Sequence, residues 1–238
     1  MSFQSPYAAQ VPLPFFGPYG DPQSFELYFP GANREAYQCL LELCDTASPL
    51  SLYLWGGPGS GKSHLLQATC QRFYERGRQA AYLPLSQIPE WSPAVLEGLE
   101  SLDLVGLDEI DCLAGQPEWE LALLHLYNRL GDSARPLIMA GRIHPQGLSI
   151  KRADLKSRLL GSLVFHLQGL NDEAKVMSLQ QRAGARGFEL PLEVARYLLK
   201  HYPRDMKALC CLLDTLDRAS LVAQRRLTIP FVRALLDS

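Results

Sequence analysis

A glycine-rich segment, residues 56–63, has the residue types and spacing needed to hold the phosphates of a nucleotide. It fits the P-loop pattern G-x-x-x-x-G-K-[ST], in which glycines let the backbone wrap a phosphate with its N–H groups turned inward. A helix expected to begin at Lys62 adds the positive end of its dipole, and the Lys62 ammonium can reach the β- and γ-phosphates. The residues that we expect to contact the nucleotide here are Pro58, Gly59, Ser60, Gly61, Lys62, Ser63 and His64.

Two acidic residues, Asp108 and Glu109, follow an apolar run at residues 102–107 that we predict to be a buried strand. Ligands of α/β sheets bind beyond the carboxyl ends of the strands, which is where both carboxylates would lie. We expect Asp108 and the Ser63 hydroxyl to hold Mg²⁺, and Glu109 to orient an attacking water. Strands that end in acids are also common without function, but the P-loop upstream favours the functional interpretation.

Two arginines, Arg158 and Arg204, have positions from which they could reach phosphates. Arg158 precedes the last predicted strand, on what we expect to be a surface loop, and could reach a neighbouring molecule's nucleotide. Arg204 stands where a C-terminal helix is expected to begin, and could reach the bound phosphates. Arginine is always charged and forks around phosphate oxygens, although most single arginines are solvated surface charges.

Strands alternating with helices are predicted to position these residues. Apolar runs predict five strands, at residues 50–55, 80–85, 102–107, 136–140 and 163–167. Amphipathic or capped segments between them predict helices at residues 33–44, 62–74 and 118–130. Such alternation is typical of an α/β fold with a parallel sheet covered on both faces.

Beyond Gly169 the pattern predicts helices alone. They are expected from Asn171 or Asp172 to 186, at 192–201, from Pro203 to 224, and from Thr228 onward. We therefore predict three parts: a flexible tail at residues 1–24, an α/β nucleotide-binding domain at 25–168, and a small all-helical lid at 169–238.

Composition limits the function. A formal net charge of −2, with 47% hydrophobic and 20% charged residues, is ordinary for a soluble protein. The total charge does not suggest a basic face for nonspecific nucleic-acid binding, and leaves a local basic patch open. Neither a membrane-spanning run nor a signal peptide is evident, so a cytoplasmic protein without membrane contact is expected. The six cysteines form no CxxC pair, and buried free thiols are the expected state.

The whole chain resembles the AAA+ ATPases, and among them the family of the bacterial replication initiator DnaA and its Hda-type regulators. The resemblance is carried by residues 53–55, 63–66, 119–120, 126–129, 186–191, 216–220 and 225–232. It implies an AAA+ P-loop domain of five parallel strands with a helical lid, and an adenine nucleotide, ADP in Hda-type proteins. It implies that residues 25–33, with Phe29, pass the nucleotide base, that Arg158 is the arginine finger, and that Arg204 is the sensor 2 arginine.

Two departures from the family matter. Arg142 occupies the sensor 1 place, where the family usually has Asp, and this lowers the expectation that the protein hydrolyses ATP by itself. The sequence ends at Ser238 with the lid, where DnaA continues into a helix-turn-helix domain, so we expect no direct sequence-specific DNA binding.

An apolar peptide at residues 10–16 lies within the polar N-terminal segment. It resembles the motif Q-x-x-L-x-F by which bacterial proteins bind the sliding clamp (beta subunit) of DNA polymerase, and its prolines favour an extended form. The residues expected to bind the clamp are Gln10, Leu13, Phe15 and Phe16. A tail that packs on its own domain, or a disordered start, is the alternative.

The expected function is negative regulation of replication initiation, in which the clamp-bound protein stimulates hydrolysis of DnaA-bound ATP through Arg158. One alternative is a self-contained AAA+ ATPase or helicase loader, which the intact Lys62, Asp108 and Glu109 favour. Another is an adaptor in which the P-loop is structural and Arg158 idle. The sequence leaves open whether ADP or ATP is resident, and whether the protein is a homo-oligomer.

Overall fold

A computed structural model describes residues 23–223 and 226–236. Its centre is a parallel sheet with the strand order β2-β3-β4-β1-β5. The strands are β1 (Ser51–Trp55), β2 (Ala80–Pro84), β3 (Leu104–Asp108), β4 (Leu137–Gly141) and β5 (Leu163–His166). All five predicted strands and their parallel arrangement are confirmed, with β1 paired to both β4 and β5.

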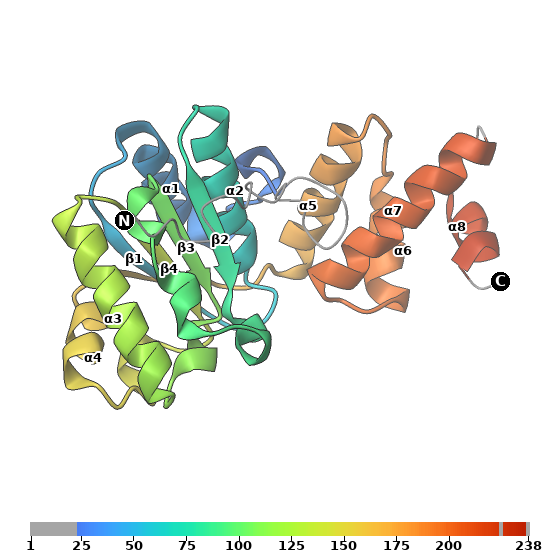
Figure 1. The fold of residues 1–238 in the computed structure, drawn as a ribbon. Helices are drawn as coiled ribbons and strands as arrows, with labels where there is room; N and C mark the ends of the chain where they lie inside the picture. The colour runs from blue at the N-terminus through green and yellow to red at the C-terminus, as the bar shows by residue number, and fades with distance from the viewer. Residues whose placement is uncertain (1–22, 224–225, 237–238) are drawn as a thin grey trace.

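Helices cover both faces of this sheet (Figure 1). One core packs α1 (Arg34–Thr46) and α2 (Lys62–Glu75) on one face, and a second packs α3 (Pro117–Asp132) and α4 (Ala153–Leu160) on the other. The central strands β3 and β4 are buried along their whole length, which explains why their sequences are continuous apolar runs. This layered base domain brings the carboxyl ends of β1, β3 and β4 to one edge.

A second, all-helical unit follows the sheet and has its own apolar core (Figure 1). It consists of α5 (Asp172–Ala185), α6 (Leu192–His201), α7 (Met206–Ala223) and α8 (Ile229–Leu236). The side chain of Asn171 caps α5, since its Oδ1 accepts a hydrogen bond from the Ala174 N–H at 2.9 Å. The expected boundary at residues 168 and 169 falls between β5 and α5, and the domain limits stay predictions.

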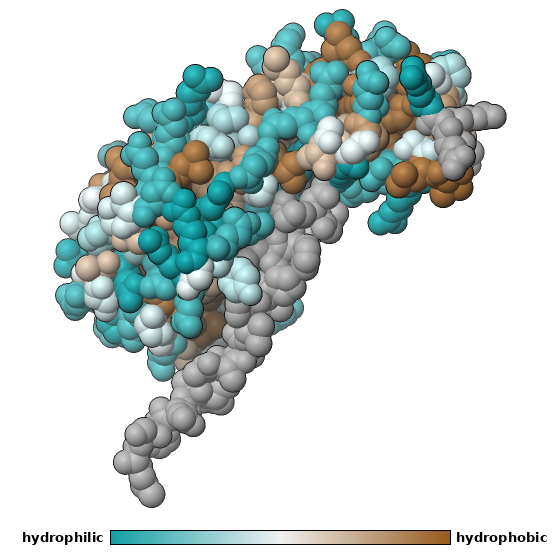
Figure 2. Space-filling model, turned by 90° about the horizontal axis from the view of Figure 1, so that it is seen from above, coloured by the Kyte–Doolittle hydropathy of each residue, from teal (hydrophilic) through white to brown (hydrophobic). Residues whose placement is uncertain are grey.

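The exposed surface differs between these two units (Figure 2). Hydrophobic residues gather at the lid end, whereas hydrophilic residues dominate the visible face of the base domain. Exposed apolar side chains of the lid include Met177, Leu192, Leu221 and Val222. Within the described ranges, no helix is long and apolar enough to cross a bilayer.

Two helix predictions were wrong in detail. The segment before β5 was expected to be a loop, but residues Ala153–Leu160 form α4, which is too short to show a clear helical period in the sequence. The third lid helix was expected from Pro203, but α7 begins at Met206 because the Asp205 carboxylate accepts the Ala208 N–H and so caps the helix there. Arg158 therefore lies on a helix, and Arg204 lies before one.

Several short 3-10 turns were not predicted. Among them, η1 (Phe25–Leu27) and η2 (Gly31–Asn33) give the segment ahead of α1 a defined path. Gln23, Phe25 and Tyr28 are already buried there, so this segment packs on the base domain from Gln23 onward. The predicted clamp motif at residues 10–16 lies outside the described residues.

Candidate nucleotide-binding site

The P-loop joins β1 to α2, as the sequence predicts, and two of its glycines are sterically required. A Cβ on Gly56 would lie 2.2 Å from the carbonyl oxygen of Leu167, in the segment after β5. A Cβ on Gly61, where φ is +92°, would lie 2.7 Å from Cε2 of Tyr28. These approaches let the loop fit between β5 and the N-terminal segment, with the start of α2 at its end.

The Lys62 ammonium lies on the P-loop itself. Its Nζ donates hydrogen bonds to the carbonyl oxygens of Gly56 at 2.7 Å and Gly57 at 2.9 Å, and to Ser60 Oγ at 3.3 Å. Burial lowers the pKa of Lys62 below its ordinary value, and the negative charges of Asp108 and Asp111 oppose this shift. The ammonium is therefore a charged donor that can exchange loop carbonyls for phosphate oxygens.

Ser63 and Asp108, the residues predicted to hold Mg²⁺, meet at the carboxyl end of β3. Asp108 is buried, and its carboxylate accepts hydrogen bonds from the hydroxyl of Tyr82 at 2.8 Å and the N–H of Glu109 at 2.9 Å. Burial raises the pKa of Asp108, while its hydrogen bond with Ser63 acts in the opposite direction. One hydroxyl and one carboxylate oxygen together form a donor set that suits Mg²⁺.

Glu109 adopts a left-handed backbone conformation, with φ of 61° and ψ of 44°, which is uncommon outside glycine. This turn sends the chain from β3 directly into η6 (Ile110–Leu113). The Glu109 charge also acts on Lys62, where it opposes the lowering of the lysine pKa. The Glu109 carboxylate is therefore close enough to act on Lys62, and its role in orienting a water stays a prediction.

The segment before α1 lies against the P-loop through Tyr28 and the Ser24 carbonyl. Tyr28 packs on Gly61, and His64 Nε2 lies 2.8 Å from the Ser24 oxygen. Phe29, the residue expected to bind the base, is half-buried and lies near Gly31. Tyr28, rather than Phe29, makes the described contact with the P-loop, and passage of the nucleotide base by this segment stays a prediction.

The two arginines lie on different parts of the molecule. The Arg158 side chain is exposed on α4, with its guanidinium 6.0 Å from the centre of the Tyr127 ring. Helix α4 lies on the side of the base domain away from the lid (Figure 1). Arg204 is exposed, and its Nη1 lies 3.4 Å from the Asp172 carboxylate, in a lid groove of about 430 Å³. It makes this ion pair within the lid rather than a contact with the P-loop.

Three polar residues to which the sequence analysis assigned no site role hold this arrangement together: Asn33 and Glu120 are buried, and Asp111 is half-buried. The Asn33 side chain donates to the Gln168 carbonyl at 2.9 Å and accepts from the Gln168 N–H at 2.8 Å, which ties the exit of β5 to the N-terminal segment. A polar residue before a helix predicts an N-cap, yet Asn33 makes no capping bond to α1. The third residue, Asp111, accepts the Arg142 N–H at 2.7 Å.

Glu120, another of these three residues, positions the start of α4. Its carboxylate is fully buried and accepts hydrogen bonds from the N–H groups of Gly115, Lys151 and Arg152, at 2.8 to 3.1 Å. Charged acceptors make the stronger hydrogen bonds, so this carboxylate fixes the residues that lead into α4. An acid on the apolar side of a predicted helix is the signal that could have identified it.

His64 connects the base domain to the lid. While Nε2–H donates to the Ser24 carbonyl, Nδ1 accepts a hydrogen bond from Arg182 of α5 at 3.2 Å. Burial, and then the Arg182 charge, lower the pKa of His64 to about 4. The ring is therefore neutral at pH 7, and protonation of Nδ1 would remove its contact with the lid.

Acid should destabilise the protein through His64. Because the folded pKa is below the unfolded value of 6.5, the unfolded chain binds more protons between pH 6.5 and about 4, and stability falls as the pH drops through this window. The loss should reach about 3 kcal/mol, and urea unfolding at several pH values measures it. His64→Asn should flatten this slope relative to the exposed-histidine control His125→Asn; parallel curves for the two variants would contradict the prediction.

Comparisons with known proteins agree with this geometry. Residues 172–236 match the family model described as "Hda, lid domain". Domain III of the Thermotoga maritima replication initiation protein DnaA has a TM-score of 0.74 and 22% identity, over 93% of this chain and 98% of that one. AMPPCP-bound DnaA from Aquifex aeolicus has a TM-score of 0.67 and 24% identity, over 87% of this chain and 67% of that one.

A more distant structure shares the same fold. The Thermotoga maritima RuvB Holliday junction branch migration motor has a TM-score of 0.63 and 16% identity, over 87% of this chain and 68% of that one. The sheet order, the P-loop and the helical unit behind it are thus arranged as in AAA+ proteins, and the lid sequence is of the Hda type. The chain therefore has the AAA+ fold of DnaA domain III, and its residues 172–236 match the Hda lid domain.

Proposed function

We propose that this protein is a DnaA-related negative regulator of replication initiation, which stimulates hydrolysis of ATP bound to DnaA. The observation that carries the proposal is that Arg158 is exposed on α4, a helix on the side of the base domain away from the lid (Figure 1). Within the described residues, no carboxylate lies within ion-pair distance of its guanidinium. An arginine supplied in trans meets the charge that develops on the transferred phosphoryl group.

The nucleotide of the protein itself has a supporting role in this proposal. An adenine nucleotide, ADP in particular, binds the P-loop through Lys62, with Mg²⁺ held by Ser63 and Asp108. When bound, Mg²⁺ neutralises phosphate charge. The AMPPCP bound to DnaA of similar fold supports an adenine nucleotide at this site. Because His64 connects α2 to Arg182, occupancy of the P-loop would stabilise the contact between base and lid.

The sliding clamp is the second proposed partner. The motif at residues 10–16 would tether the protein to clamp loaded on DNA and so raise its effective concentration near DnaA. A weak contact between the regulator and DnaA then suffices while replication proceeds. This part of the proposal rests on the sequence motif.

The direct test is hydrolysis of radiolabelled ATP bound to DnaA, measured with clamp-loaded DNA in the presence and absence of this protein. Stimulation that requires the clamp is the expected result, and a protein lacking residues 1–20 should lose it while still binding ADP. Stimulation of the same size without clamp would refute the tether. No stimulation at all would refute the regulatory function.

A self-contained ATPase is the second candidate, and the proximity of Lys62, Ser63 and Asp108 favours it. Steady-state ATP hydrolysis by the purified protein separates the two. Turnover at ordinary enzyme rates without DnaA would establish the second candidate in place of the first.

A further inference from the structure

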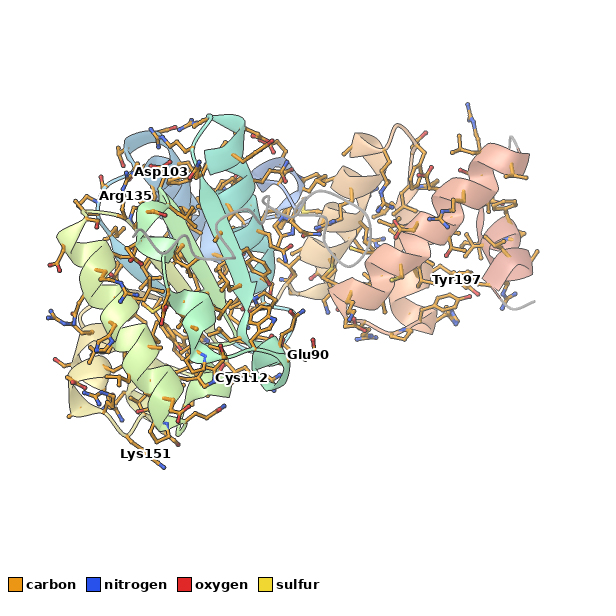
Figure 3. All side chains as sticks on the ribbon, viewed as in Figure 1. Glu90, Asp103, Cys112, Arg135, Lys151 and Tyr197 are labelled. Carbon is orange, nitrogen blue, oxygen red and sulfur yellow. The ribbon has the colours of Figure 1, made fainter. Side chains whose placement is uncertain are left out.

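Asp111 lies at the end of a strand that is distant from it in sequence. It belongs to η6, which follows β3, yet its Oδ2 accepts the Arg142 N–H beyond β4 at 2.7 Å. A Cβ on Gly141 would lie 3.3 Å from the same oxygen. Cys112, its neighbour in sequence, lies in the lower half of the base domain in Figure 3. Asp111 therefore adds a carboxylate to the end of β4, where the chain's own residue is a cationic Arg142.

The second carboxylate oxygen of Asp111 is unusual. Oδ1 is buried and has no hydrogen-bond partner among the described residues. The Tyr53 hydroxyl also approaches Gly141, but it donates to the Ile143 carbonyl at 3.2 Å instead. Buried acceptors are nearly always satisfied, so an unpartnered one points to an ion, a water or a functional role.

The charge of Asp111 acts on the P-loop. The end of β4 that Asp111 holds is bonded to the P-loop, because the Gly56 N–H donates to the Gly141 carbonyl at 3.3 Å, and its charge opposes the effect of burial on the Lys62 pKa. It likewise raises the pKa of Tyr53, after the larger effect of burial. Asp111 thus combines a structural contact with an electrostatic effect on the phosphate site.

We propose that Asp111 is a positioning residue of the nucleotide site: Oδ2 holds the end of β4, and the carboxylate supplies a negative charge that acts on Mg²⁺ and its waters. The proposal rests on nucleotide binding at the P-loop. It adds a second carboxylate to the predicted Mg²⁺ site of Ser63 and Asp108, from an element that the sequence did not assign to it.

The negative charge of Asp111 should have opposite effects on the binding of metal-free and Mg²⁺-bound nucleotide. A carboxylate beside the phosphates repels a nucleotide that arrives without metal, and attracts one that carries Mg²⁺. Removing the charge at Asp111 should therefore strengthen binding of metal-free ADP and weaken binding of Mg²⁺-ADP. The ratio of the ADP affinities with and without Mg²⁺ measures this effect of the charge.

The experiment is calorimetric titration of the full chain with ADP, once with Mg²⁺ and once with EDTA. Asp111→Asn keeps an oxygen to accept the Arg142 N–H but removes the charge. We expect the Mg²⁺ enhancement of ADP affinity to fall at least about fivefold in this variant. Asp111→Glu, which keeps the charge, should retain the enhancement.

Asp103→Asn is the matched control, because it makes the same chemical change at the opposite end of the sheet. Asp103 pairs with Arg135, and both residues lie at the upper edge of the base domain in Figure 3. This control should leave the Mg²⁺ enhancement unchanged. Asp111→Ser provides a second neutral variant in case Asp111→Asn does not fold.

Either folded neutral variant with wild-type Mg²⁺ enhancement would overturn the proposal and leave Asp111 as a structural contact alone. Unfolding of both neutral variants would overturn it too, in favour of the same structural role. The proposed site fails differently: if ADP binding survives Lys62→Ala, or the wild-type chain binds no ADP, the P-loop is not the site. If the protein does not stimulate hydrolysis of DnaA-bound ATP, the proposed regulatory function fails, but the interpretation of both ADP titrations is unchanged.

Discussion

Replacing Arg158 with alanine should reduce the stimulation of DnaA-bound ATP hydrolysis by about 10³-fold or more, with the fold intact. An arginine finger in trans contributes about 10³ to 10⁵ in rate, because it stabilises charge present only in the transition state. The side chain is exposed, and its described contact is the Tyr127 ring at 6.0 Å, so its loss should cost less than about 1 kcal/mol of folding stability. Single-turnover hydrolysis with clamp-loaded DNA measures the effect, and thermal unfolding checks the fold.

A matched control is available at the start of the same helix. Arg152 lies just before α4 and pairs with Asp154 at 2.8 Å on the surface, so Arg152→Ala removes the same charge from the same region. It should retain most of the stimulation. Arg158→Lys should remain strongly impaired, since lysine keeps the charge but lacks the planar fork. Full stimulation by Arg158→Ala would instead support an adaptor in which this arginine is idle.

Replacing Gly56 with alanine should destabilise the protein by roughly 3 kcal/mol or more and abolish tight nucleotide binding. The new Cβ would lie 2.2 Å from the Leu167 carbonyl oxygen, which is backbone and cannot rotate away. Leu167 is held in turn, because its N–H donates to the Trp55 carbonyl at 2.7 Å. The strain must displace either the P-loop or the segment after β5. Urea unfolding and ADP titration measure the two effects.

Gly57 is the control for this prediction, because it is the next residue in the same loop. A Cβ at Gly57 would meet nothing within 4 Å, and its φ lies outside the left-handed region. Gly57→Ala should therefore change stability by less than about 1 kcal/mol. Equal losses in the two variants would show that flexibility of the loop, rather than close approach at Gly56, is what the glycines provide.

The Arg158 and Gly56 variants test two separate roles, which are action on the nucleotide of a partner and binding of the protein's own nucleotide. The P-loop, Ser63 and Asp108 lie at the carboxyl edge of the sheet and concern the protein's own nucleotide. Arg158 lies on α4, where Glu120 fixes the residues that lead into the helix. Damage at Gly56 should thus lower ADP affinity directly, whereas Arg158→Ala should leave ADP affinity unchanged.

Local patterns in the sequence determined the sheet and the phosphate loop. Apolar runs of strand length predicted all five strands, because a parallel sheet covered on both faces needs buried residues at successive positions. The spacing of Gly61, Lys62 and Ser63 predicted the P-loop, since backbone wrapping of a phosphate allows few alternatives. The pairing of Ser63 with Asp108 followed, because parallel strands end at one edge.

Contacts between distant segments were decided by the tertiary structure alone. Helix α4 is too short for its period to be clear, and its start depends on a buried carboxylate from α3. Asn33 has the sequence signature of a helix cap, but its side chain satisfies the Gln168 backbone, more than a hundred residues away. Asp111 likewise acts at the end of β4 rather than beside its own strand. Local propensity carries no information about such partners, because burial and hydrogen bonding select them only once the chain has folded.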